Sequence, residues 1–179
     1  LVNNLQHSFD SRIKKLDWMS EETKLRALAK LHAFTKKIGF PDKWKNYEGL
    51  VIKHDDFLGN VRRCNQWFYE ENISKLGKPI DKTEWGMTPP TVNAYYSPQK
   101  NEIVFPAGIL RFPFFDFNAD DAINYGGIGA VIGHEMTHGF DDQGRQFDDE
   151  GNLHDWWTKA DADEFKKRAD EVVQQYNGY

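Results

Sequence analysis

The sequence of 179 residues has a single cysteine, Cys64. One cysteine excludes an intrachain disulfide and a cluster of thiolate metal ligands. The sequence also lacks the run of about 18 apolar residues that a membrane-spanning helix needs, so we expect no membrane segment within these residues. Its first residues have neither the basic start nor the apolar run of a signal peptide.

A positive net charge is missing as well. The formal charge is −5, and the surplus of acidic residues falls after residue 60. Because a surface that binds nucleic acid needs clustered Lys and Arg, we expect no nucleic-acid partner. Hydrophobic residues make up 39% of the chain, which is ample for a folded core and is not typical of intrinsic disorder.

Apolar residues at helical spacing predict two helices within residues 1–40. Ser20 is the expected cap of the second helix, which we predict to run to Gly39. The basic residues of this pair are expected on a solvated face. The same spacing predicts a helix over residues 57–73 and a last helix that is capped by Thr158.

Two short β-prone segments, residues 91–96 and 102–105, predict a hairpin with a loop at 97–101. Pro90 and Pro98 flank the first segment, which favours an edge strand over a central one. An edge strand can receive an extended peptide. An ordinary hairpin with no binding role is the alternative.

The pattern H-E-x-x-H occurs at His134, Glu135 and His138, in a predicted helix that begins near Ala119. Positions i and i+4 share one helix face, so both imidazoles can reach a single Zn²⁺. Glu135 projects beside them, where it can take a proton from a zinc-bound water. The alternative is that these are two ordinary helix histidines and a surface glutamate.

Four glycines lie within this predicted helix: Gly126, Gly127, Gly129 and Gly133. Each glycine costs about 1 kcal/mol in a helix interior relative to alanine. Burial with close backbone contact is the expected compensation, so we predict that the helix is central.

A zinc site of this kind needs a third protein ligand. The metzincin pattern requires a glycine where this sequence has Asp141 and a histidine where it has Gly144, so that class is excluded. The other common ligand is a later glutamate with an aspartate four residues on. None of the three later glutamates has such an aspartate: Glu150, Glu164 and Glu171.

The acidic segments 141–144 and 148–151 could suggest calcium loops. Aligning either glycine with the sixth loop position places Gly139 or Gln146 first, where an EF-hand requires aspartate. We therefore expect solvated turns here.

Several motifs in order resemble the neprilysin family of zinc endopeptidases. They are L-D-W-M at 16–19, I-G-F-P-D at 38–42, N-A-Y-Y at 93–96, N-E-I-V-F-P-A-G-I-L at 101–110, P-F-F at 113–115 and H-E-M-T-H-G-F-D-D-Q-G-R at 134–145. The resemblance implies that His134 and His138 bind one Zn²⁺ and that Glu135 is the general base. It also implies that Asn93 and Ala94 hold the backbone of a peptide substrate.

The resemblance implies an α+β, mainly helical fold. It would be part of a thermolysin-like (gluzincin) catalytic lobe with an edge β-hairpin, plus a helical segment of a second lobe. Residues 1–55 would be the C-terminal part of the helical lobe and 56–179 the N-terminal part of the catalytic lobe. Asp141 is implied as a partner of a ligand histidine, although a helix-end cap would also explain it.

Family members are several times longer, and their glutamate ligand lies beyond the H-E-x-x-H motif. The resemblance therefore implies that the third ligand comes from outside this chain, from the remainder of the catalytic lobe. We expect a zinc endopeptidase as the parent protein, with an extracytoplasmic location, and an inactive 179-residue piece. A peptide-binding or interaction module that does not use the metal is the alternative.

Overall fold

The computed structural model describes residues 1–179. The chain divides into two compact units. We call residues 1–40 with 85–179 the main unit, and residues 41–84 the middle unit. This division of the chain is not the lobe boundary that we predict after residue 55. In the structure, the first 40 residues fold with the C-terminal half of the chain. The assignment of residues 1–55 and 56–179 to two lobes of a larger protein stays a prediction.

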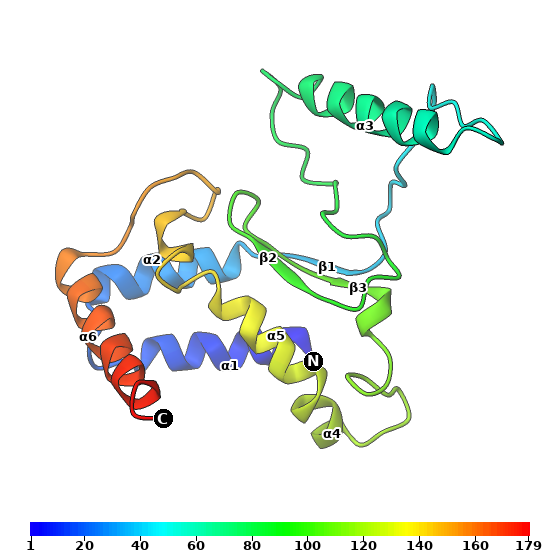
Figure 1. The fold of residues 1–179 in the computed structure, drawn as a ribbon. Coiled ribbons are helices and arrows are strands. Elements are labelled where there is room, and N and C mark those ends of the chain that lie inside the picture. The colour runs from blue at the N-terminus through cyan, green and yellow to red at the C-terminus, as the bar shows by residue number, and fades with distance from the viewer. The chain divides into compact units, whose positions relative to one another are not determined.

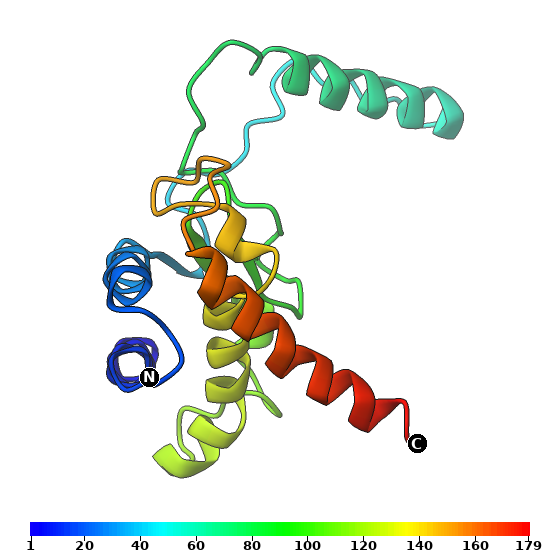
Figure 2. The same cartoon turned by 90° about the vertical axis from the view of Figure 1, so that its left-hand side faces the viewer.

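The main unit is mostly helical (Figure 1). Its α-helices are α1 (Val2–Lys14), α2 (Glu21–His32), α4 (Asp121–Gly126), α5 (Ile128–Thr137) and α6 (Lys159–Tyr176). Two short 3₁₀ helices, η1 (Ala107–Ile109) and η2 (Gly144–Gln146), lie in the connections. Helix α1 packs against both α2 and α5, as two views of the molecule show (Figures 1 and 2).

A three-stranded sheet completes the main unit. Its strands are β1 (Thr35–Gly39), β2 (Tyr95–Ser97) and β3 (Glu102–Pro106), in the order β1-β3-β2. Strands β2 and β3 are antiparallel, which confirms the predicted hairpin and places β2 at the sheet edge, although β2 begins at Tyr95 and not at residue 91. The mainly helical α+β fold class is also confirmed.

Strand β1 corrects the sequence prediction. The second helix was expected to run to Gly39, but α2 ends at His32 and the next residues pair with β3 in parallel. The Thr35 amide donates to the Asn101 carbonyl at 3.0 Å, where this pairing starts. A parallel partner more than 60 residues away leaves no local signal, and tertiary pairing overrides helix propensity.

The core lies between α1, α2, α5 and β3. Ile128, Ile132 and Met136 form a buried stripe on α5 at intervals of four residues. They belong to one cluster that includes Ile13, Ala27, Leu31, Phe34, Ile103, Phe105, Trp156 and Trp157. This burial confirms that the H-E-x-x-H helix is central.

The predicted single helix from about residue 119 is in fact two helices, broken at Gly127. Asp120 caps α4 by accepting from the Ala122 amide at 2.8 Å. The Ile128 amide donates to the Phe114 carbonyl at 2.7 Å, outside either helix. A Cβ at Gly127 would overlap that carbonyl oxygen. The segment 114–128 therefore folds back on itself at a position that only glycine fits.

The expected close contact at all four glycines was wrong for two of them. A Cβ on Gly126 or Gly133 would meet no atom within 4 Å, whereas Gly129 would make an ordinary contact with Tyr125. Only Gly127 is required by a close backbone approach. The helix cost of Gly129 and Gly133 is compensated by burial of the apolar stripe on α5.

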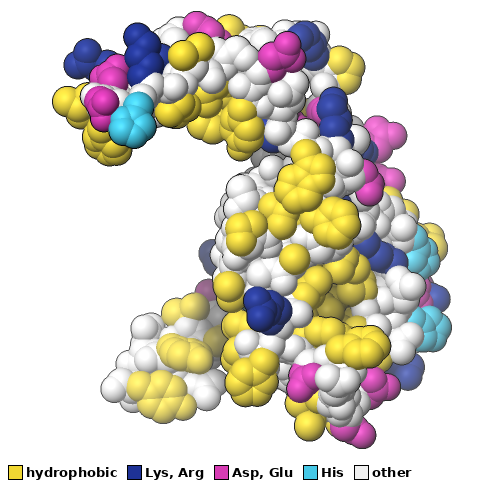
Figure 3. Space-filling model, turned by 90° about the vertical axis from the view of Figure 1, so that its right-hand side faces the viewer, with side chains coloured by type: hydrophobic (Ala, Val, Ile, Leu, Met, Phe, Trp, Pro, Cys, Tyr) yellow, Lys and Arg dark blue, Asp and Glu magenta, His cyan; other side chains and the backbone are white.

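The middle unit contains α3 (Phe57–Ile73), as predicted. Asp56 caps this helix by accepting from the Gly59 amide at 3.0 Å. No α3 residue is buried, and hydrophobic side chains gather along one side of this unit (Figure 3). A cluster of aromatic rings, Tyr47, Trp67 and Phe68, holds the preceding loop to the helix. No helix in the structure has the length and apolar character to cross a membrane.

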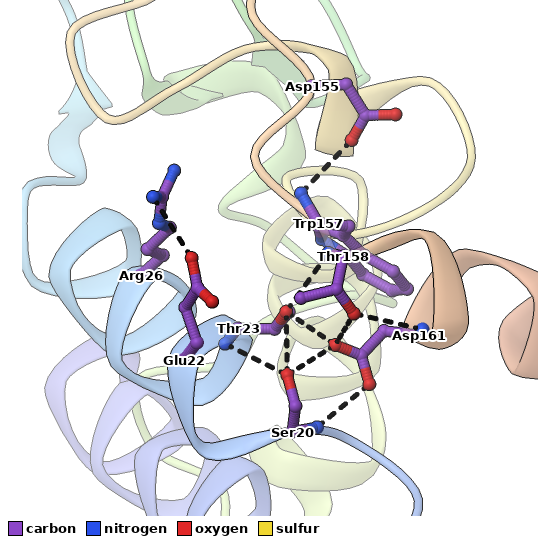
Figure 4. A network of polar contacts seen from close by, with 8 residues as sticks. All are labelled: Ser20, Glu22, Thr23, Arg26, Asp155, Trp157, Thr158 and Asp161. Atoms are coloured by element: carbon purple, nitrogen blue, oxygen red, sulfur yellow. Dashed lines mark hydrogen bonds and ion pairs between the residues drawn. The ribbon is translucent and has the colours of Figure 1, made fainter.

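One buried carboxylate joins the start of α2 to the start of α6 (Figure 4). Asp161 accepts from the Ser20 amide at 2.8 Å and from the Ser20, Thr23 and Thr158 hydroxyls at 2.6 Å each. Ser20 and Thr158 are also the helix caps, as predicted. Burial by itself raises the pKa of Asp161, but the hydrogen bonds outweigh it and lower the pKa to about 2.

Because the pKa of Asp161 is lower in the folded state than its ordinary value of 3.8, the network stabilises the fold above that pH. This stabilisation, about 2 kcal/mol, should be lost as the pH falls from about 4 to about 2. Urea unfolding between pH 7 and pH 2 should show that Asp161→Asn costs most at neutral pH. Asp163→Asn, an exposed carboxylate on the same helix, is the control, and it should cost little at any pH. A pH-independent difference between Asp161→Asn and the wild type would contradict the network's role.

Adjacent glycines should respond in opposite ways to alanine. Gly126→Ala should raise the free energy of unfolding by about 0.5 kcal/mol, because the site is open and alanine favours the helix. Gly127→Ala should lower it by about 2 kcal/mol or more, because the new Cβ meets the Phe114 carbonyl. Urea midpoints measure both changes, and equal effects at the two sites would refute the assignment of the break to Gly127.

Candidate metal centre

Helix α5 presents His134 and His138 one turn apart on the side away from the buried stripe. The two Nε2 atoms are 3.0 Å apart, and the ring planes are nearly perpendicular at 81°. Ring nitrogens that share a tetrahedral Zn²⁺ at about 2.1 Å stand roughly 3.4 Å from each other. The two nitrogens therefore converge on one point in a way that suits two ligands of a single metal ion.

Asp141 fixes the orientation of the second histidine. Its Oδ2 lies 2.7 Å from Nδ1 of His138, while its Oδ1 accepts from the amides of Gln143 at 3.0 Å and Gly144 at 2.7 Å. When Nδ1 donates its proton to a carboxylate, Nε2 keeps its lone pair for a metal. The donor set of this structure thus fits zinc: it has two imidazole nitrogens, and the other ring nitrogen of His138 lies against a carboxylate.

Glu135 lies on the inner side of the histidine pair and is only 6% exposed. Burial raises the pKa of its carboxyl above the ordinary value, while both imidazoles and a hydrogen bond from the Tyr96 amide oppose that rise. Tyr96 belongs to β2, so this hydrogen bond brings the edge strand against α5. A buried carboxylate with a raised pKa is a good acceptor for a proton at neutral pH.

Asn93 and Ala94 lie directly before β2. Asn93 is exposed, and its side-chain oxygen accepts from the Ala94 amide at 2.9 Å. Ala94 is 6% exposed and belongs to the core cluster. The structure thus places this pair directly before the strand that contacts Glu135.

The turn after α5 packs tightly against the helix end. A Cβ on Gly144 would overlap the His138 carbonyl oxygen, so only glycine fits. Arg145 pairs with Asp155 at 3.4 Å and lies over the Trp157 ring, which braces the loop. Asp148 accepts from the amides of Glu150 and Asn152, so this acidic turn uses its carboxylate within the loop.

No group of three His, Cys, Asp or Glu side chains among residues 1–179 is close enough to hold a metal ion. The structure thus brings together two histidines and a base, without a third ligand. An open apolar pocket of about 700 Å³ lies elsewhere on the main unit, between residues 89–92 and 107–114. None of the predicted site residues lines it.

The sequence did not predict two groups that lie next to the candidate site. One is the Tyr96 amide, because a backbone donor has no sequence signal. The other is Lys30 on α2, which was expected on a solvated face but is 1% exposed. Its place between Ala27 and Leu31, both fully buried, was the available signal.

Two histidines one helical turn apart, a buried glutamate beside them and an edge strand against the same helix are typical of zinc peptidases. Comparison with known proteins agrees. Two sequence profiles of peptidase family M13 match residues 1–41 and 93–179. The chain belongs to this family, which confirms the resemblance to the neprilysins.

Similar proteins include an endothelin-converting enzyme homolog of Locusta migratoria, 48% identical over 100% of this chain and 26% of that protein. Among solved structures, the zinc metalloprotease ZMP1 of Mycobacterium tuberculosis in complex with an inhibitor is 55% identical, with a TM-score of 0.95 over 99% of this chain and 27% of that one. PEPO of Lactobacillus rhamnosis is 36% identical, with a TM-score of 0.88 over 93% of this chain and 27% of that one. The chain spans about a quarter of the length of these relatives.

Proposed function

We propose that these residues form part of a zinc-dependent endopeptidase that hydrolyses peptide bonds. The observation that carries the proposal is the pair of Nε2 atoms, 3.0 Å apart, beside the buried carboxylate of Glu135. Membership in peptidase family M13 and the zinc metalloprotease among the structural neighbours support it.

In this proposal His134 and His138 hold the zinc ion through Nε2. When bound, zinc lowers the pKa of a water molecule towards about 7 and polarises the scissile carbonyl. Glu135 takes the proton of the attacking water on its carboxylate and returns it to the leaving amine. Asp141 keeps His138 in the tautomer that presents a lone pair at Nε2.

The edge strand gives the substrate class. An extended peptide can lie along β2. In this proposal Asn93 and Ala94 bind the backbone of that peptide. This position would bring the peptide beside Glu135, because the Tyr96 amide of the same strand donates to that carboxylate.

We further propose that the third zinc ligand is a glutamate from outside these 179 residues, in the remainder of the catalytic lobe. The lack of a third ligand among residues 1–179 supports this. With two ligands only, the isolated 179 residues should bind zinc weakly and hydrolyse nothing measurable. The extracytoplasmic location stays a prediction.

Substitution of Glu135 should separate metal binding from chemistry in the complete protein. Glu135→Gln should lower peptide turnover roughly 10³-fold, since general-base catalysis contributes about 10²–10⁴-fold. Zinc affinity should stay near the wild-type value, whereas His138→Ala should lose zinc. A quenched peptide measures turnover and calorimetry measures zinc binding. Wild-type turnover in Glu135→Gln would exclude Glu135 as the base. Unchanged zinc affinity in His138→Ala would favour the non-catalytic peptide-binding module.

The role of Asp141 can be tested against its neighbour. Asp141→Ala should weaken zinc binding about 10- to 100-fold, because the carboxylate no longer orients His138. Asp142→Ala is the matched control, since Asp142 bonds the Gln143 side chain and touches neither histidine. Competition with a chelator measures both affinities. Equal affinities for the two variants would show that Asp141 serves only as a helix-end cap.

A further inference from the structure

Lys30 is a charged side chain buried behind the turn that follows the H-E-x-x-H helix. It extends from α2 and is 1% exposed. Its Nζ donates to the carbonyls of Gly144 and Phe147, each at 2.6 Å. The ammonium therefore spans both ends of the short turn that contains η2.

Aromatic rings and carboxylates compensate for this burial. The rings of Tyr96, Phe140 and Trp156 lie 5.6 to 5.9 Å from Nζ, within the range of cation–π attraction. Burial lowers the pKa of Lys30 to about 8, while three nearby aspartates raise it: Asp148, Asp141 and Asp149. The side chain is thus mainly protonated at neutral pH.

The turn connects Lys30 to His138 through two residues, Gly144 and Asp141. The Gly144 carbonyl accepts from Lys30, and the Gly144 amide donates to Asp141 at 2.7 Å. Asp141 in turn lies 2.7 Å from Nδ1 of His138. Three contacts of 2.6 to 2.7 Å therefore run from α2 to the imidazole, and Gly144 also packs directly on the His138 carbonyl.

We propose that Lys30 is a positioning residue for the metal centre: it holds the Gly144 turn so that Asp141 can orient His138. This inference rests on the proposed function. A buried ammonium that served the fold alone would need no connection to the carboxylate that orients a ligand. Outer contacts of this kind commonly change metal affinity 10- to 100-fold.

Zinc affinity in the complete protein tests the inference without measuring activity. Lys30→Met keeps the apolar stem and removes the ammonium, and it should weaken zinc binding about 10-fold. Lys24→Met is the matched control on the same helix, because Lys24 pairs with Glu21 and not with the turn. Asp161→Asn lowers stability through a carboxylate that bonds Ser20, Thr23 and Thr158 and not the turn. It should leave zinc affinity unchanged and separate positioning from general destabilisation.

A double variant shows whether Lys30 acts through Asp141. Zinc binding by Lys30→Met/Asp141→Ala should be no weaker than by Asp141→Ala alone, since both changes break the same chain of contacts. Lys30→Arg, which keeps a cation, should recover part of the lost affinity. Additive losses, or wild-type affinity in Lys30→Met, would overturn the inference. If His138→Ala also left zinc binding unchanged, the proposed function would fail with it.

If Lys30→Met does not fold, labelling of Lys30 in the wild-type protein still tests the inference. Acetylation of Lys30, followed by mass spectrometry, should slow several-fold when zinc is added, because an ordered turn covers the amine. Acetylation of Lys24 should not change. In Asp141→Ala the effect of zinc on Lys30 should disappear. A labelling rate at Lys30 that is independent of zinc would overturn the inference.

Discussion

The buried stripe on α5 determines where both histidines point. Ile128, Ile132 and Met136 are 1 to 3% exposed and pack into the core. A helix fixed along one side has no freedom to rotate, so the side opposite the stripe is fixed as well. His134 and His138 lie there, with Nε2 atoms 3.0 Å apart. The geometry of the candidate metal centre is thus a consequence of core packing.

Contacts from distant segments support the histidine and glutamate side chains of this site. The Tyr96 amide of β2 reaches Glu135, and Lys30 of α2 reaches the turn that carries Asp141. Both approach α5 from elements that precede it by dozens of residues. The first 40 residues belong to the same compact unit as the H-E-x-x-H helix.

The sequence predicted those features of the fold that depend on interactions between neighbouring residues. Ser20 and Thr158 cap their helices, residues 57–73 form α3, and β2 is an edge strand, as the prolines near it predicted. Caps and prolines act on neighbouring residues, so the sequence contains the whole cause. The break at Gly127 was missed because it depends on the Phe114 carbonyl, which approaches through a fold of the intervening loop.

The sequence by itself determined which groups form the candidate site: two histidines four residues apart, a glutamate beside them and an aspartate three residues on. Helical periodicity is a property of consecutive residues, so this spacing required no knowledge of the fold. The tertiary structure decided which charges are buried and which strands pair. In the folded chain, Lys30 is buried next to three aromatic rings, and residues 35–39 pair with β3 as a strand. Burial and pairing depend on partners far along the chain, and no local pattern specifies them.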